Sequence, residues 1–504
     1  MKILAREMQD RARRDPDAVV VVDPQRTHRL GAVVTAAERA AEHMGSVSDA
    51  PPTVLIQADN TWQTVAAAVA VGLRGGVVAV LSPHATASEF ALALQDIDPD
   101  MVVADLRTLD AWGVSDESFP AGGVALGDRH LRARRTTSDV DRWAGGCVIA
   151  MTSGSTGRPK CVVQSEESLR YAVSCTRDAV GIDEGDAIGA FVPLSSVAAA
   201  CFGMYLPLFV GGVMVSIGKW SPAAALEAMA DHAVRWTMLV PTMALQLSLV
   251  PGCDGRLSAM RAMTVGGGPM NADALGRAEN ALGTTFLRVF GMSECLGHTT
   301  SAPDDDPRVR LGTDGRAFPG TTVRAVDGSG RDLGVGVIGD AQVRGPSLFR
   351  GYARGGTVTP PDLTADGFLP TGDLVEVAPD GAITVMGRQK QVIIRGGRNI
   401  DINEVEAAVA AIDGVVQVCV VPVPDDLLSE RAGALVVTDG RALTLADVTD
   451  HLGHRGVPRH NWPEYVFVVD DLPQNRVGKL SRPDAVSMAA RLAGRADPNS
   501  PRVQ

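Results

Sequence analysis

Short apolar runs alternate with amphipathic helical patterns through the first half of the chain. The apolar runs are interpreted as buried strands and lie at 53–57, 76–81, 101–106, 236–240 and 262–268. Helical patterns fall between them, for example at 60–74 and 221–232. Strands that alternate with helices in this way are typical of mostly parallel sheets with flanking helices. The pattern therefore predicts an α/β fold.

The hydrophobic pattern changes twice in the second half of the chain. From about residue 309, short runs punctuated by glycine and aspartate predict the hairpins of a small β-rich subdomain. From about residue 388, a strand, a helix that we expect Asn403 to cap, and a further strand predict a compact α+β unit. We therefore expect a large N-terminal domain, 1–387, and a small C-terminal domain, 388–504.

Length and net charge narrow the classes of protein. The 504 residues exceed what one hydrophobic core usually supports, which agrees with at least two domains. The formal net charge of −12 repels polyanions, so nucleic acid is not an expected partner. The short basic stretch at 129–135 is interpreted as a solvated loop ahead of a strand.

Cysteine spacing and the lengths of the apolar runs bear on the protein's environment. The seven cysteines are scattered singly, with no CxxC pair and no histidine cluster, so neither a disulfide framework nor a zinc site is indicated. No apolar run is long enough to span a bilayer, and the N-terminal pattern lacks the apolar core of a signal peptide. We expect a cytoplasmic protein without membrane insertion.

A segment rich in glycine and hydroxyl residues carries the first candidate chemistry. Residues 151–160 read MTSGSTGRPK and follow a strand-like run. Glycines let backbone N–H groups approach phosphate oxygens, hydroxyls add donors, and Lys160 supplies a cation. The segment is not a Walker A loop, because Pro159 precedes the lysine and the chain continues as a strand. A kinase or GTPase is therefore disfavoured.

Further motifs follow in order along the chain. They read GGGPM at 266–270, FGMSE at 290–294, TGD at 371–373, GRQK at 387–390 and LPQNRVGK at 472–479. An aromatic such as Phe290 can stack on adenine, and the Glu294 carboxylate suits Mg²⁺ held by phosphates. Together with residues 151–160, these motifs resemble those of the adenylate-forming enzymes, which comprise acyl- and aryl-CoA synthetases, peptide-synthesis adenylation domains and luciferases. The resemblance covers nearly the whole chain.

The resemblance implies a nucleotide site assembled from several segments. The ATP- and AMP-binding residues would be Thr152, Ser153, Gly154, Ser155, Thr156, Gly157, Lys160, Gly267, Gly268, Phe290, Gly291, Met292, Ser293, Asp373, Arg388 and Lys479. Asp373 would accept hydrogen bonds from the ribose hydroxyls, and Glu294 with Thr156 would bind the metal. The implied cofactors are ATP, Mg²⁺ and coenzyme A.

The reaction implied by the resemblance has two steps. Lys479, Lys160 and Glu294 would be catalytic, with Lys479 stabilising the charge that develops as a substrate carboxylate attacks the α-phosphate of ATP. A thiol would then displace AMP from the acyl-AMP. The small domain would turn about the hinge residue Lys390 between the steps. The CoA tunnel would be lined by Arg395, Gly396 and Gly397.

The acyl pocket is also implied by the resemblance. Its lining would include Ser196, Val197, Ala200, Gly266, Gly268, Met292, Leu296 and His298. Peptide-synthesis domains place an aspartate within 192–201 to pair an amino group, and this chain has none there, so a buried ammonium would stay unpaired. Small residues such as Ala200 leave volume for substrate, unless they only pack against a neighbouring helix. The expected substrate is a bulky apolar or alicyclic carboxylic acid.

Departures from the family's pattern leave alternatives open. Many relatives have an acidic residue at Gln391 and threonine at Asn475, positions that touch the implied hinge and lysine loop. An enzyme specialised for one half-reaction is therefore one alternative, and a stand-alone adenylation enzyme that loads an acyl carrier protein is another. A non-catalytic nucleotide-binding scaffold is disfavoured, because it would need none of the charged motif residues. The oligomeric state stays open, a homodimer included.

Overall fold

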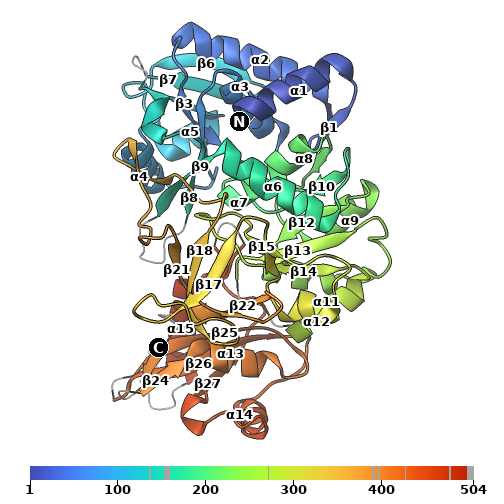
Figure 1. Ribbon diagram of the computed structural model, residues 1–504, viewed down its shortest axis with the longest axis vertical. Coiled ribbons are helices and arrows are strands. Elements are labelled where there is room, and N and C mark those ends of the chain that lie inside the picture. The colour runs from blue at the N-terminus through green and yellow to red at the C-terminus, as the bar shows by residue number, and fades with distance from the viewer. Residues whose placement is uncertain are drawn as a thin grey trace.

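The buried apolar runs form the strands of two large sheets, with the N-terminal helices at one end of the molecule and the small domain at the other (Figure 1). The computed structural model describes residues 1–134, 138–152, 159–268, 270, 272–388, 392–395, 398–425, 427–475 and 478–496. The predicted α/β class, with a β-rich subdomain and a small α+β domain, is confirmed.

The first large sheet has nine strands and is covered on both faces. Its order is β20 (Thr357–Thr359), β19 (Gly351–Arg354), β9 (Lys160–Ser165), β8 (Gly146–Thr152), β4 (Val77–Leu81), β3 (Thr53–Gln57), β5 (Met101–Asp105), β7 (Arg129–Ala133) and β6 (Ala121–Leu126). Val54 and Ile56 pack with helices α1 (Lys2–Arg14), α2 (Leu30–Val47) and α3 (Trp62–Leu73). Leu55 points to the other face, with α4 (Ala87–Ile97) and α5 (Leu106–Trp112), because side chains alternate along a strand.

The second large sheet brings two of the sequence motifs to one edge. Its seven strands run in the order β14 (Phe286–Val289), β13 (Ala262–Gly266), β12 (Trp236–Leu239), β10 (Ala187–Gly189), β11 (Val213–Val215), β1 (Val19–Val22) and β2 (Thr27–Arg29). β13 and β14 are parallel neighbours, so the motifs that follow their carboxyl ends lie side by side. Helices α10 (Pro241–Ser248) and α11 (Ala272–Leu282) make the crossovers.

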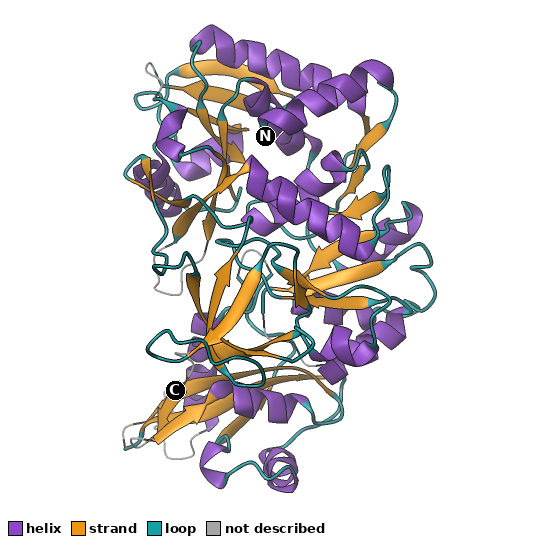
Figure 2. Cartoon of the chain, viewed as in Figure 1, coloured by secondary structure: helices purple, strands orange, loops and turns teal. Residues whose placement is uncertain are grey.

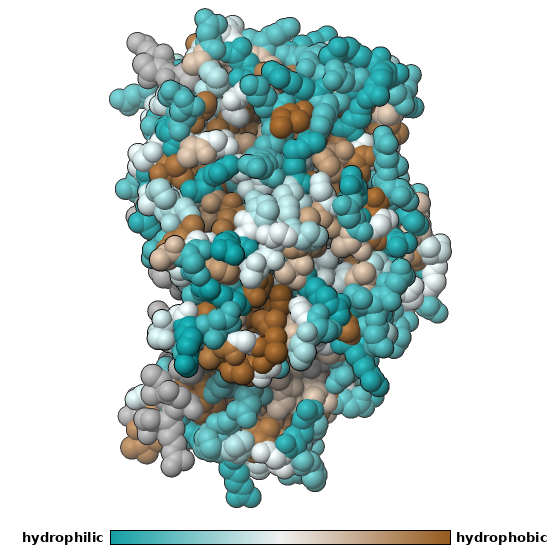
Figure 3. All heavy atoms as spheres, in the orientation of Figure 1, coloured by the Kyte–Doolittle hydropathy of each residue, from teal (hydrophilic) through white to brown (hydrophobic). Residues whose placement is uncertain are grey.

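The β-rich subdomain is an antiparallel sheet. It runs in the order β17 (Thr322–Val326), β18 (Gly339–Arg344), β21 (Leu369–Val377) and β22 (Ile383–Arg388). Hydrophobic atoms gather at the surface over this sheet on an otherwise mostly hydrophilic face (Figure 3). The remaining elements of the large domain are β15 (Thr299–Thr300), β16 (Arg316–Ala317), α6 (Glu166–Val180), α7 (Val197–Ala199), the π-helical turn Ala200–Tyr205, α8 (Leu206–Phe209), α9 (Pro222–Asp231), α12 (Pro307–Gly312) and the 3₁₀ turn Val140–Trp143.

The small domain consists of a five-stranded sheet with helices on both faces (Figure 2). Its elements are β23 (Val392–Arg395), β24 (Arg398–Asp401), α13 (Ile402–Ala410), β25 (Val415–Asp425), β26 (Ser429–Thr438), α14 (Leu445–His454), the 3₁₀ turn Arg459–Asn461, β27 (Tyr465–Val468) and α15 (Arg482–Ala496). The predicted cap of α13 is wrong. Asp401, not Asn403, is the N-cap, and its carboxylate accepts the Asn403 N–H at 2.8 Å. The chain enters α13 directly from a strand, which places the cap at the strand's last residue.

The basic stretch is not the predicted loop. Arg129 begins strand β7 and is 4% exposed, because its guanidinium pairs with the Asp59 carboxylate. A long-range ion pair of this kind leaves no signal in the local sequence. Within the described residues, the structure has no helix long and apolar enough to cross a membrane.

Candidate active site

Strand pairing brings together Lys160, Glu294 and Tyr352. β19 runs antiparallel to β9 and places Tyr352 beside the strand that Lys160 begins. The Tyr352 hydroxyl donates to Glu294 Oε1 at 2.8 Å, and the Lys160 ammonium lies 5.0 Å from the centre of the tyrosine ring. A cation at this distance from an aromatic ring is attracted to it. Two predicted catalytic residues are thus joined by a tyrosine that the sequence reasoning missed.

The same contacts fix the Glu294 segment. Burial and the adjacent Glu294 carboxylate raise the pKa of Tyr352, so its hydroxyl stays protonated as a donor. The Glu294 carbonyl accepts the Phe349 N–H at 2.9 Å, and the Ser293 carbonyl accepts from the Gln164 amide at 2.8 Å. Both Ser293 and Glu294 are therefore held against the nine-stranded sheet.

Glu294 fits a magnesium ion held mainly by nucleotide phosphates. Such an ion takes one or two protein carboxylates and keeps phosphate and water ligands, so it needs no dedicated cage. Among the described residues, no three His, Cys, Asp or Glu side chains cluster as a metal site. Glu294 would supply the carboxylate oxygen, while the second predicted ligand, Thr156, lies outside the described residues.

The aromatic residue of the FGMSE motif packs against an imidazole. Phe290 is 7% exposed, and its N–H donates to the Thr299 hydroxyl at 2.9 Å. Its ring meets that of His298 edge-on, with centroids 4.5 Å apart. Burial lowers the pKa of His298 to about 4, so the imidazole is neutral at physiological pH.

The two ribose candidates are cross-strand neighbours. Asp373 of β21 pairs in register with Arg388 of β22, at the end of the four-stranded sheet. Asp373 is 6% exposed, and its N–H donates to the Thr371 hydroxyl at 3.1 Å. The TGD turn therefore points its aspartate into the protein rather than into bulk solvent.

The lysine of the small domain reaches the large domain. A Cβ built on Gly267 would lie 2.8 Å from Lys479 Nζ, so the ammonium lies against the turn that follows β13. Gly267 has φ +85°, a conformation that favours glycine, and a side chain there would displace the end of the lysine. The Gly478 carbonyl accepts from the Thr242 hydroxyl of α10 at 2.9 Å. The LPQNRVGK and GGGPM motifs thus meet across the two domains.

Asn475 shapes the lysine loop although relatives often have threonine there. Its side-chain oxygen accepts the Lys479 N–H at 3.0 Å, and its own N–H donates to the Lys479 carbonyl at 2.7 Å. Asn475 therefore closes the loop with two hydrogen bonds to Lys479.

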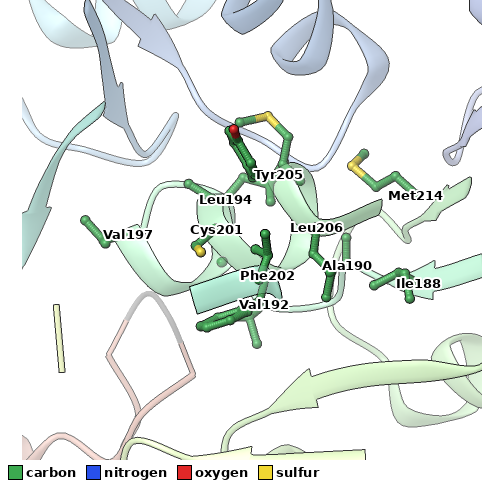
Figure 4. Packing of buried hydrophobic residues seen from close by; sticks show 14 of the residues in the cluster. Ile188, Ala190, Val192, Leu194, Val197, Cys201, Phe202, Tyr205, Leu206 and Met214 are labelled. Atoms are coloured by element: carbon green, nitrogen blue, oxygen red, sulfur yellow. The ribbon is translucent and has the colours of Figure 1, made fainter. Parts of the chain in front are cut away.

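Four of the predicted acyl residues belong to the protein interior. Val197, Ala200, Leu296 and His298 are all buried. Phe202, which the sequence reasoning missed, touches the turn before His298: a Cβ on Gly297 would lie 2.7 Å from the Phe202 ring. Figure 4 shows Phe202 among the apolar side chains of residues 188–206.

The other acyl candidates are Ser196, Met292, Gly266 and Gly268. The Ser196 hydroxyl caps α7 by accepting the Ala199 N–H at 3.2 Å, which gives it a structural role. Met292, Gly266 and Gly268 are partly exposed. Gly291 approaches the backbone of Gly297, so the FGMSE motif folds back on the turn before His298.

Of the remaining predicted residues, Thr152 lies beside Lys160, whereas Arg395 is bonded within the small domain. Thr152 ends β8, and its hydroxyl donates to the Lys160 carbonyl at 3.3 Å. The Arg395 guanidinium pairs with Glu464 and donates to the His460 carbonyl, both in the small domain. The predicted residues outside the described part of the chain are Ser153, Gly154, Ser155, Thr156, Gly157, Lys390, Gly396 and Gly397.

The sequence matches the models of two known protein families. The model described as AMP-binding enzyme matches residues 8–353, and the model described as AMP-binding enzyme C-terminal domain matches residues 404–479. The chain belongs to the AMP-binding enzyme family. An adenylating activity of the ligase class is therefore supported for this AMP-binding enzyme, whose family uses ATP and Mg²⁺.

Relatives of this AMP-binding enzyme include two proteins named for salicylate. "Salicylyl-CoA synthase / salicylate adenylyltransferase" of a Streptomyces species is 30% identical over 461 residues, which cover 85% of this chain and 83% of that protein. "Salicyl-AMP ligase / salicyl-S-ArCP synthetase" of Mycobacterium tuberculosis is 28% identical over 511 residues, or 94% of this chain and 88% of the relative.

A solved structure matches almost the full length of both chains. ATP-bound MatB from Rhodopseudomonas palustris superposes with a TM-score of 0.82 at 27% identity, covering 97% of this chain and 99% of MatB. The apo form of MatB, with the same coverage, gives a TM-score of 0.72. The AMP-binding enzyme described here is thus closer in shape to the ATP-bound form.

Proposed function

We propose that this AMP-binding enzyme joins a carboxylic acid to AMP and then transfers the acyl group to the thiol of coenzyme A. The observation that carries the proposal is the Lys479 ammonium at the Gly267 turn. In the first step the carboxylate of the acid approaches the α-phosphate of ATP, and two anions repel each other. A cation beside both stabilises the charge on the in-line path.

The other residues would position the nucleotide rather than react with it. Phe290 would stack on adenine, Asp373 with Arg388 would hold the ribose, and Glu294 would hold Mg²⁺ on the phosphates. Lys160 begins a strand beside Tyr352, which supports a role as a phosphate-binding cation. Neither step needs a protein nucleophile, so positioning and electrostatic stabilisation account for catalysis.

The acid is proposed to be a bulky, ring-bearing carboxylic acid. The buried apolar side chains around Phe202 support the predicted preference for apolar bulk. The names of the two relatives favour an aromatic ring over an alicyclic one, since both refer to salicylate.

The movement of the small domain is part of the proposal. Residues 388–504 would turn about Lys390 after adenylation and present the side of Gly396 and Gly397 to the thiol. The closer match to ATP-bound than to apo MatB supports assigning the present arrangement to the adenylation step.

A panel of carboxylic acids with ATP, Mg²⁺ and CoA tests the function directly. Mass spectrometry should detect acyl-AMP and acyl-CoA as separate products for at least one acid. A second candidate acceptor is the phosphopantetheine of a carrier protein, which the name of the Mycobacterium tuberculosis relative favours. Acyl-AMP without acyl-CoA, together with loading of a carrier protein, would select that candidate. The absence of pyrophosphate exchange with every acid would refute both.

A further inference from the structure

The buried imidazole of His298 has one ring nitrogen without a hydrogen-bond partner. Its side chain is fully buried, and within the described residues no group bonds to Nε2. Nδ1 lies 3.0 Å from the Cys295 carbonyl oxygen. Buried polar atoms in native proteins nearly always have a partner, so an orphaned Nε2 on a predicted acyl residue points to a ligand.

The hydrogen bond at Nδ1 decides what Nε2 can bind. A carbonyl oxygen only accepts, so Nδ1 must carry the proton. The imidazole is neutral because burial lowers the pKa of His298 to about 4. Nε2 is therefore a bare lone pair that accepts and does not donate. It cannot bind a carboxylate or a phosphate oxygen, but it suits an O–H or N–H donor.

The surroundings of His298 are aromatic. Its ring packs edge-on against Phe290, and the preceding Gly297 touches the Phe202 ring. The His298 carbonyl accepts the Phe318 N–H at 2.9 Å, which fixes the backbone of the turn. An aromatic environment with one fixed acceptor favours a flat ligand that carries a donor on its ring.

We propose that His298 Nε2 accepts a hydrogen bond from a ring hydroxyl or amino group of the substrate, so that the enzyme selects aromatic acids bearing such a donor. This inference rests on the proposed function, because it assumes that the acid is bound beside Phe202 and residues 295–298. An acid without the donor leaves Nε2 buried and unpaired, which costs binding in the transition state as well as in the ground state.

Matched pairs of acids test the proposal. The probes are hydroxybenzoates and hydroxynaphthoates, each compared with the same acid lacking the hydroxyl. For a pair that the enzyme activates, kcat/KM for pyrophosphate exchange should be about 10- to 100-fold higher for the acid with the hydroxyl than for the acid without it. This preference is the ratio of the two kcat/KM values. In His298→Leu the ratio should fall to about 1, while His298→Gln, which keeps an acceptor oxygen, should retain part of the preference.

A second imidazole, which is only partly buried, provides the control. His451 of the small domain also has an Nε2 without a partner among the described residues, so His451→Leu removes a comparable group away from the predicted acyl residues. This variant should keep the wild-type ratio. Binding of non-hydrolysable acyl-AMP analogues, with and without the hydroxyl, measures the same ratio by calorimetry without turnover.

The outcomes separate this inference from the proposed function. A wild-type enzyme that activates both members of a pair equally would overturn the role of His298, and so would a folded His298→Leu variant that keeps the preference. Activation of non-aromatic acids alone would also overturn it while leaving acyl-AMP formation standing. If no acid of any class supports pyrophosphate exchange, the proposed function fails as well.

Discussion

Tyr352 links two charged groups that the sequence motifs identified separately. Lys160 and Glu294 could be predicted because each belongs to a motif whose residue types suit phosphate or metal binding. Tyr352 could not, because its hydrogen bond to Glu294 spans 58 positions and depends on the pairing of β19 with β9. An isolated tyrosine after a loop carries no local signal of that role. His298 was predicted as a pocket residue, but its orphaned nitrogen emerges only from the folded contacts.

Replacing Tyr352 with phenylalanine should weaken the binding of Mg²⁺ during pyrophosphate exchange. The variant keeps the ring beside Lys160 but removes the donor that holds the Glu294 carboxylate. We expect the Mg²⁺ concentration for half-maximal pyrophosphate exchange to rise about 3- to 10-fold, in line with the loss of one hydrogen bond. Tyr171→Phe is the control, since that hydroxyl bonds Pro319 and Thr321 instead. An unchanged Mg²⁺ requirement in Tyr352→Phe would contradict the role.

At the scale of elements, periodicity predicted the strands well. The run at 53–57 is β3, and the helical pattern at 221–232 contains α9. These elements are specified locally, by β-branched residues in buried strands and by helical spacing of apolar positions. The errors at Arg129 and at the cap of α13 arose where an ion pair or a strand connection decided the local structure.

A buried ion pair ties strands β14 and β22 to the loop that carries Asp314. The Asp314 carboxylate, 2% exposed, accepts from the Arg288 guanidinium of β14 at 3.0 Å and from the Val385 N–H of β22 at 2.8 Å. Asp314→Ala would leave a buried guanidinium unpaired, so the free energy of unfolding should fall by about 3–5 kcal/mol in urea titrations. Asp110→Ala, at an exposed position of α5, should leave stability almost unchanged. Equal stability of both variants would show that the Asp314 pair is not structural.

At the scale of the molecule, the way in which the small domain docks on the large domain could not be predicted from sequence. The order of the motifs implied a shared site, but the contact between Lys479 and Gly267 depends on how the domains dock.

Thr242→Val should lower pyrophosphate exchange about 3- to 10-fold by removing the hydrogen bond to Gly478. It should leave thiol transfer from supplied acyl-AMP intact. Ser248→Ala, which removes a bond within the same helical region, is the control, and a matching loss in both variants would argue against a docking role.

The most direct test concerns Lys479 itself. Lys479→Ala is compared with Lys219→Ala, which removes an exposed lysine of the large domain. Each variant is assayed for pyrophosphate exchange and, separately, for transfer of supplied acyl-AMP to CoA. If Lys479 bridges the substrate carboxylate and the α-phosphate, exchange in Lys479→Ala should fall by a factor of about 100 or more while thiol transfer changes little. Retention of exchange, or equal loss of both half-reactions, would contradict the account.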